Sequence, residues 1–368
     1  MKRTRISKVL ALFLAFLLMT APIALATEKV TIAYPQADSG NARYTIMANT
    51  VKRLGALEGI DFVFEDADYS PEAQVAFFEN QIAAGAKGIL FWPAADAMLP
   101  TITKLCEENG VYWAIAFRSI SDPAIEEIVY NSPYYVGRVN EDEVSTGYMV
   151  GKEAADLGYK KVAVINTPRG DNAGDLRYIG LTQACEEFGI EIVAEARDMK
   201  QPADITSATE SFLTAHSDLD AVVMLASVVA DTLNPIAKAI MDAGRQDSVK
   251  LLSVDFWDGM TDLFEMGILK VCVGHPHIGY DPYICAVKLV NQLSGNPISD
   301  DQIDNVLGMY PIRTYEDSKI YEDKFLNTDA LYYSDEWVSE NLLKRNNPEL
   351  SGEMIQQFMD EWNPLQDY

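Results

Sequence analysis

Residues 66–96 constrain the fold more than any other stretch of the chain. Turn-forming residues lead into Pro71, apolar residues then recur at the spacing of one helix face, and Gly85 can end that helix. The run 88–91, Gly-Ile-Leu-Phe, has the pattern of a short buried strand, and Pro93 stops it. Helix, tight turn and strand in this order form half of a parallel βαβ unit.

The same unit recurs along the chain in two series, with no linker rich in Ser, Gly or Pro between them. The strands expected in the first series are 30–34, 61–65, 88–91 and 111–116. Those expected in the second series are 161–165, 191–196, 221–224 and 251–255. Strands that alternate with helices build doubly wound parallel sheets, and 368 residues suffice for two lobes of roughly 100–200 residues. We therefore predict an α/β protein of two doubly wound parallel-sheet lobes.

The first 26 residues have the features of a cleaved export signal. Four basic residues precede an apolar run over 9–19, and Ala24-Leu25-Ala26 offers a small-x-small cleavage site. A single membrane anchor is the alternative, but the run is short for a span of about 20 residues. No cysteine lies near the cleavage site for lipid attachment, so we expect an exported protein located in the periplasm.

The chain is strongly acidic, with a formal net charge of −26. Removal of residues 1–26 takes away four basic residues and no acidic one, which leaves a net charge of −30. Such acidity argues against nucleic acid and anionic lipid as partners. The four cysteines, Cys106, Cys185, Cys272 and Cys285, match no zinc pattern. Their apolar surroundings favour buried free thiols, and disulfides in an oxidising compartment are the alternative.

In open parallel sheets, ligands bind at the carboxyl ends of the strands, where the loops converge. The segments that this rule selects are 36–44, Trp92, 117–118, 168–177, 226–227, 255–257 and His275. Asp and Asn pair with hydroxyls, Arg supplies a rigid fork of donors, and aromatic faces stack on a ring. These residue types suit a small, hydroxyl-rich molecule.

The motif of residues 66–96 resembles that of the exported sugar-binding proteins of ABC importers, of the ribose-binding type, and the similarity continues with gaps from about residue 30 to about residue 314. The resemblance implies the type I periplasmic binding protein fold, with three hinge crossings near 136–140, 274–278 and 309–315. The domains expected from it are a signal peptide (1–26), lobe 1 (27–137 plus 276–309), lobe 2 (138–275 plus 310–330) and a C-terminal extension (331–368) packed on a lobe.

The resemblance also assigns roles to single residues. Arg118 matches the arginine of the first lobe that binds sugar hydroxyls, Arg177 matches the arginine of a second-lobe helix, and Asp255 matches an acidic residue at a strand end. The predicted ligand-binding residues are Asn41, Tyr44, Trp92, Phe117, Arg118, Arg177, Ser227, Asp255, Trp257 and His275. Structural alternatives are a solvated helix face for Arg177, a helix cap for Asp255, and lobe packing for both tryptophans.

The chain departs from the family pattern at three places. Phe117 stands where family members with this arginine usually have Asp, Arg43 occupies a position that is often aromatic, and a second-lobe Asn falls near Ala226 or Ser227. One wall of the site is therefore less polar than in the family and another is more cationic. A modified sugar, a sugar-like signal molecule or a nucleoside is expected in place of ordinary ribose or galactose.

The expected function is capture of a small polar ligand between two lobes that close over it. An ABC permease in the membrane, or a chemoreceptor, then recognises the closed form of a monomeric protein that carries no cofactor and no metal. A sensor for a sugar-like signal is the alternative within this fold. A secreted carbohydrate-processing enzyme is the alternative from another class, because the chain has enough carboxylates to supply the catalytic pair of a glycosidase. Against an enzyme, the sequence contains no G-x-S-x-G, H-E-x-x-H or phosphate-loop motif. The central hypothesis is that Arg118 faces Arg177 and Asp255 across one crevice.

Overall fold

The structure, a computed structural model, describes residues 29–36, 42–66, 70–227, 229, 231–257, 259–274, 279–325 and 331–362. The predicted export signal, Asn41 and His275 lie outside these residues, and the side chain of Tyr44 is not described. The hypotheses for these parts of the chain therefore stay predictions.

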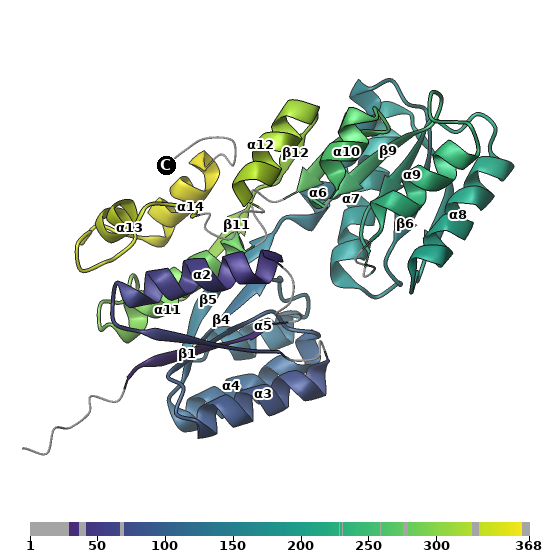
Figure 1. The fold of residues 1–368 in the computed structure, drawn as a ribbon. Helices are drawn as coiled ribbons and strands as arrows, with labels where there is room; N and C mark the ends of the chain where they lie inside the picture. The colour runs from purple at the N-terminus through teal and green to yellow at the C-terminus, as the bar shows by residue number, and fades with distance from the viewer. Residues whose placement is uncertain are drawn as a thin grey trace, which may run out of the picture.

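The first lobe is a six-stranded parallel sheet between two layers of helices (Figure 1). Across the sheet the strands are β11 (Ile303–Leu307), β5 (Tyr135–Glu141), β4 (Tyr112–Phe117), β3 (Gly88–Phe91), β1 (Thr31–Gln36) and β2 (Asp61–Asp66). One face packs on α2 (Ala42–Ala56) and α11 (Tyr280–Leu293). The other face packs on α3 (Pro71–Ala83), α4 (Leu99–Asn109) and α5 (Pro123–Tyr130).

The stretch 66–96 folds as its pattern indicates. Ser70 caps α3 by accepting a hydrogen bond from the Ala73 N–H, and Pro71 occupies the first turn. Gly85 follows the helix with φ +92, a conformation that glycine adopts without steric cost, and β3 is buried along its whole length. The predicted helix, turn and strand are confirmed.

The second lobe repeats the plan of the first. Its strands, in spatial order, are β12 (Tyr310–Ile312), β10 (Leu269–Gly274), β9 (Lys250–Val254), β8 (Ala221–Met224), β6 (Lys161–Asn166) and β7 (Glu191–Arg197). All pairs are parallel except β10 with β12. The helices α6 (Glu143–Asp156) and α7 (Asn172–Phe188) cover one face, and α8 (Pro202–Ala215), α9 (Leu233–Asp242) and α10 (Met260–Glu265) cover the other. The predicted fold class is confirmed.

The repeat extends to backbone conformation at the strand ends. β4 and β9 occupy the same place in the two sheets, and the chain bends sharply at the end of each. Phe117, the last residue of β4, has φ +65, and Asp255, directly after β9, has φ +68. Few residues other than glycine adopt this left-handed conformation, and it persists where the surroundings hold it in place. Both lobes therefore present a strained strand end at the edge that the ligand hypothesis selects.

The crossings between the lobes differ in one place from the expected boundaries. β5 pairs with β11 as far as Glu141, so residues 138–141 belong to the first lobe and not to the second. The expected boundary at 137 falls inside β5, whose later residues Asn140 and Glu141 still pair with Val306 and Leu307 of β11. The chain returns to the first lobe between Gly274 and α11, and it leaves again between β11 and β12.

The C-terminal segment, which comprises the described residues 315–325 and 331–362, contacts both lobes (Figure 1). α12 (Tyr315–Phe325) packs against α10 of the second lobe. α13 (Asp335–Asn341) and α14 (Gly352–Glu361) pack against α2 and β11 of the first lobe. Arg53 of α2 forms a two-pronged ion pair with Asp335, at 2.7 and 2.8 Å, and the Trp362 ring stacks on Tyr280 with centroids 4.7 Å apart.

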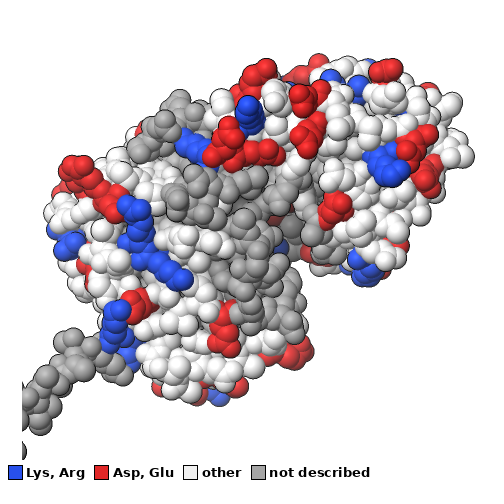
Figure 2. Space-filling model, viewed as in Figure 1, with Lys and Arg blue, Asp and Glu red and all other residues white. Residues whose placement is uncertain are grey.

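Acidic side chains lie on the visible surface of both lobes (Figure 2), consistent with the net charge. Within the described ranges, no helix combines the length and the apolar character needed to cross a membrane. All four cysteines are buried and free, which confirms the preference for thiols over disulfides. Burial raises the pKa of Cys185 to about 11 and that of Cys285 to about 12.

Candidate ligand site between the lobes

A cavity of about 320 Å³ lies between the lobes, at the carboxyl ends of their strands. Its walls are Pro93, Ala94, Ala95, Asp96, Arg118, Ser119 and Ser121 of the first lobe and Gly170, Asp171 and Asn172 of the second. A hydrogen bond joins the two walls: Asn172 Nδ2 donates to Ser121 Oγ at 2.7 Å. The cavity is thus shared, and a molecule inside it would contact both lobes.

The first-lobe wall is fixed by buried or acceptor-rich side chains. Gln74, which is buried, donates to the Trp92 carbonyl and accepts from the Ala94 N–H, so the loop after β3 has one position. Asp96 Oδ2 accepts from the Ser121 and Asp122 N–H groups, at 2.7 and 3.3 Å, and ties the loop after β4 to the loop after β3. These contacts place Arg118 and Ser121 on the same wall.

Aromatic rings close the base of this wall. Trp92 packs edge-on against Tyr34, with centroids 5.4 Å apart, and against Phe117, with centroids 6.0 Å apart. Such edge-to-face packing fixes ring orientation. Phe117, which replaces the carboxylate expected from the family, therefore contributes an apolar ring beside Arg118.

The second-lobe wall is a loop held by internal hydrogen bonds. Asp171 caps α7: its Oδ1 accepts from the Gly174 N–H at 2.8 Å and from Thr167 Oγ1 at 3.0 Å. Asp175 Oδ2 accepts from the Gly170 N–H at 2.7 Å, and its other oxygen pairs with Arg197. Burial alone would raise the pKa of Asp175, but the Gly170 N–H and Arg197 outweigh it and lower the pKa. The loop is therefore held in place by hydrogen bonds within the second lobe.

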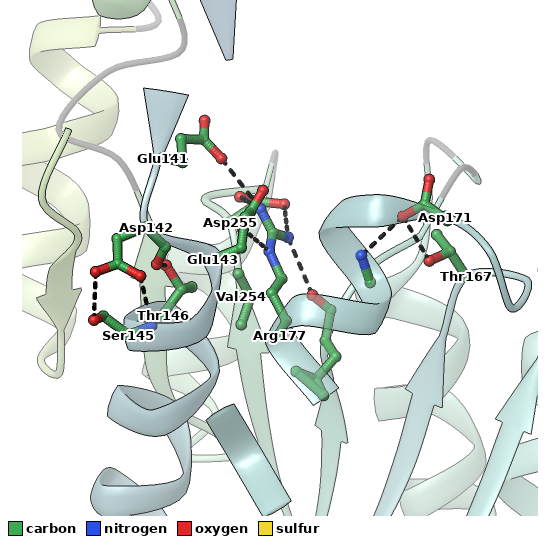
Figure 3. A network of polar contacts seen from close by, with 12 residues as sticks. Glu141, Asp142, Glu143, Ser145, Thr146, Thr167, Asp171, Arg177, Val254 and Asp255 are labelled. Atoms are coloured by element: carbon green, nitrogen blue, oxygen red, sulfur yellow. Dashed lines mark hydrogen bonds and ion pairs between the residues drawn. The ribbon is translucent and has the colours of Figure 1, made fainter. Parts of the chain in front are cut away.

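Behind this wall, Arg177 is surrounded by three carboxylates (Figure 3). Its Nε donates to Glu143 at 2.5 Å, Nη1 donates to Asp255 at 2.9 Å and to the Leu225 carbonyl at 3.1 Å, and Nη2 approaches Glu141 at 3.4 Å and Asp255 at 3.5 Å. All five N–H groups thus have acceptors within the protein. Burial opposes the charge, but Asp255, Glu143 and Glu141 hold the pKa of Arg177 well above its ordinary value.

This arrangement gives Arg177 a role other than the expected direct contact. Neither Arg177 nor Asp255 is among the residues that line the cavity; the Arg177 side chain is 5% exposed and the Asp255 side chain is 24% exposed. Glu141 ends the last strand before the first crossing, so Arg177 also joins the second lobe to the hinge. The close approach of α6 and α7 depends on Gly147, where a Cβ would lie 1.8 Å from the Arg177 carbonyl oxygen. Arg177 thus positions Asp255 and secures the crossing.

The remaining predicted residues fall into two groups. Arg118 lines the shared cavity, and Trp92 and Phe117 pack next to it. Ser227 accepts from the Val229 N–H and from Thr232 Oγ1, and Trp257 donates its indole N–H to the Val254 carbonyl. The sequence interpretation did not single out Asp96, Ser121 or Asn172. Asp96 follows the strand end at Pro93, and Asn172 lies inside the segment 168–177. Their positions after strand ends are therefore the only sequence signal that could have indicated them as site residues.

The described residues contain no group of three or more His, Cys, Asp or Glu side chains that could hold a metal ion. Each carboxylate around Arg177 contacts the guanidinium. The cavity lining offers hydrogen-bond donors and acceptors to a small polar molecule.

Comparison with known proteins defines the class. Residues 32–295 match the family model described as a periplasmic binding protein domain, and the chain belongs to this family. A protein of Rhizobium meliloti named for rhizopine binding is 26% identical over 231 residues, which cover 61% of this chain and 71% of that protein.

Solved structures share the fold. One is an ABC transporter periplasmic solute-binding protein of Actinobacillus succinogenes with bound D-allose, at 20% identity and a TM-score of 0.66, over 79% of this chain and 99% of that chain. Another is an ABC transporter solute-binding protein of Bacillus halodurans with bound myo-inositol, at 20% identity and a TM-score of 0.65, over 81% of this chain and 98% of that chain.

Proposed function

We propose that this protein captures a sugar or a sugar-like cyclic polyol between its two lobes and delivers it to an ABC permease. The observation that carries the proposal is the cavity of about 320 Å³, which takes polar side chains from both lobes. Its size is at the low end of the roughly 300–1,000 Å³ of small-molecule sites, which favours a ligand of one ring.

The lining matches the chemistry of hydroxyl groups, each of which donates and accepts. Arg118 offers a fork of donors, while Asp96, Ser121 and Asn172 offer acceptors or mixed groups. A ligand hydroxyl can replace the Asn172–Ser121 hydrogen bond with contacts to each lobe. Contacts that exist only when both walls are close shift the population toward the closed form, and a permease can recognise that form.

The proposal includes the route by which the protein meets its ligand. Removal of residues 1–26 during export would place the mature chain in the periplasm, in line with the family to which it belongs. The relatives and neighbours named above are binding proteins, and we infer binding without chemical conversion for this chain as well.

A thermal-shift screen tests the proposal. The protein lacking residues 1–26 is unfolded, dialysed and refolded to remove bound molecules, then mixed with D-allose, myo-inositol, L-arabinose, D-ribose, uridine and, as controls, amino acids. A ligand at about 100 times its Kd stabilises a folded protein by about 2.7 kcal/mol. We expect a saturable rise in Tm with at least one sugar or polyol, and mass spectrometry should recover it unchanged. A response only to amino acids, or turnover of the bound compound, would contradict the proposal.

A further inference from the structure

The part of the chain beyond the family match contacts the segment that follows β9 in the second lobe. The family model ends at residue 295, and α12 lies after it, on the second lobe. Glu322 of α12 accepts from the Thr261 N–H in the first turn of α10 at 3.3 Å. This contact docks α12 next to the segment 255–257, which connects β9 to α10.

One side chain of α12 contacts this segment directly. The Tyr321 ring meets the Phe256 ring edge to face, with centroids 4.6 Å apart and an interplanar angle of 64°. Both side chains are buried, Phe256 at 2% and Tyr321 at 6% exposure. On the other side Phe256 lies over Gly274, where an added Cβ would come within 3.0 Å of the ring. Phe256 is therefore held between α12 and the end of β10.

Phe256 directly follows Asp255, the residue with a left-handed backbone at the end of β9. Arg177 fixes the Asp255 carboxylate from one side, and the Asp255 N–H donates to the Val273 carbonyl at 2.8 Å. A left-handed residue such as Asp255, with φ +68, keeps its conformation only when its neighbours also have fixed positions. The Phe256 ring is the neighbour that the C-terminal segment holds.

Tyr321 is also close to Tyr332, which lies in the part of the C-terminal segment that packs on the first lobe. Burial raises the pKa of Tyr332 well above its ordinary value, and the nearby Tyr321 adds to this rise. Tyr332 in turn packs edge-on against Tyr283 of α11, with centroids 4.8 Å apart. Tyr321, Tyr332 and Tyr283 belong to one buried apolar cluster.

We propose that Tyr321 is a positioning residue: through Phe256 it holds Asp255 in the left-handed conformation in which its carboxylate pairs with Arg177 at the carboxyl end of β9. The inference rests on the proposed function, because it takes Asp255, a predicted ligand-binding residue that is 24% exposed, as part of the site. It gives the C-terminal segment, for which the sequence offered no functional interpretation, a place in ligand binding.

Hydrogen–deuterium exchange of the protein lacking residues 1–26, with no sugar added, tests the proposal. The reporter is the Asp255 amide, which is protected by Val273. We expect at least tenfold faster exchange there in Tyr321→Ala. Tyr321→Phe keeps the ring and should restore protection, and Ile320→Ala, at a neighbouring position that is 44% exposed, should leave exchange unchanged. Should Tyr321→Ala not fold, Phe256→Leu tests the contact from the other side and should speed exchange in α12.

Three outcomes would overturn the proposal: unchanged exchange at Asp255 in Tyr321→Ala, an equal increase in Ile320→Ala, or a uniform increase that includes β1 and β3 of the first lobe. Since no ligand is present, the result is independent of the thermal-shift screen. A screen without any binding sugar, together with faster exchange at Asp255, would refute the proposed function and leave the packing role of Tyr321 in place.

Discussion

Replacing Arg177 by Met removes the one cation inside a cluster of buried acids. Glu141 and Glu143 have side chains that are 2% and 6% exposed, and Asp255 is 24% exposed, so solvent cannot compensate their charges. Removal of one partner from a buried ion pair typically costs about 3–5 kcal/mol, because the other charge stays buried and unpaired. We expect a loss of this size, which corresponds to a fall in Tm of about 4–7 °C for a chain of this length.

The matched control is Arg53→Met. Arg53 also forms a two-pronged ion pair, with Asp335, but the two side chains are 52% and 44% exposed. Exposed pairs contribute about 0–1 kcal/mol, so this variant should lose little. Thermal and urea unfolding followed by circular dichroism measure both variants. Arg177→Met with a loss no larger than that of Arg53→Met would refute the view that Arg177 organises the wall and the crossing.

A double variant separates charge from shape. Glu143→Gln removes one carboxylate of the cluster and the shortest of its contacts with Arg177. Neighbouring substitutions in one network are not additive. We expect the double variant Arg177→Met with Glu143→Gln to be more stable than the sum of the single losses implies, since one uncompensated charge is absent.

Three further expectations follow from other residues. Arg118→Ala should weaken binding of a responsive sugar by more than about tenfold in calorimetry, because a hydrogen bond to a charged group contributes about 1.5–3 kcal/mol; unchanged affinity would remove Arg118 from the site. Asn172→Ala removes the hydrogen bond to Ser121 and should increase the ligand-free radius of gyration in small-angle scattering; an unchanged radius would show that the contact does not restrain the lobes. Burial lowers the pKa of Lys288 from 10.5 to about 8. Between these pH values the unfolded chain binds more protons than the folded chain, so the free energy of unfolding should increase as pH rises from 8 to 10. Lys288→Met should lose that gain in urea unfolding at the two pH values, and an identical pH response in both proteins would contradict it.

Local pattern was enough to predict the fold. Apolar spacing, Pro71 and Gly85 define α3, and the buried run after Gly88 defines β3, because these signals act within a few residues. The first crossing was expected at 136–140 from the family resemblance, and in the structure these residues lie in β5, where Asn140 and Glu141 pair with β11. That pairing depends on residues far along the chain, which periodicity cannot reveal.

The site was only partly predictable, for the same reason. Position after a strand found Arg118, since the carboxyl ends of parallel strands share one edge. The acids around Arg177 lie 34, 36 and 78 residues away in the sequence, so their number and burial emerge only from packing. The Phe256–Tyr321 contact likewise joins the segment after β9 to a helix outside the family match.

The most direct test of ligand capture between the lobes is small-angle scattering of the protein lacking residues 1–26, with and without a saturating amount of the sugar that raises its Tm most. We expect the radius of gyration to decrease on binding, and Arg118→Ala to need at least tenfold more sugar for the same decrease. Saturation of the protein with no change in radius, or an unaltered titration in Arg118→Ala, would place the ligand somewhere other than the shared cavity.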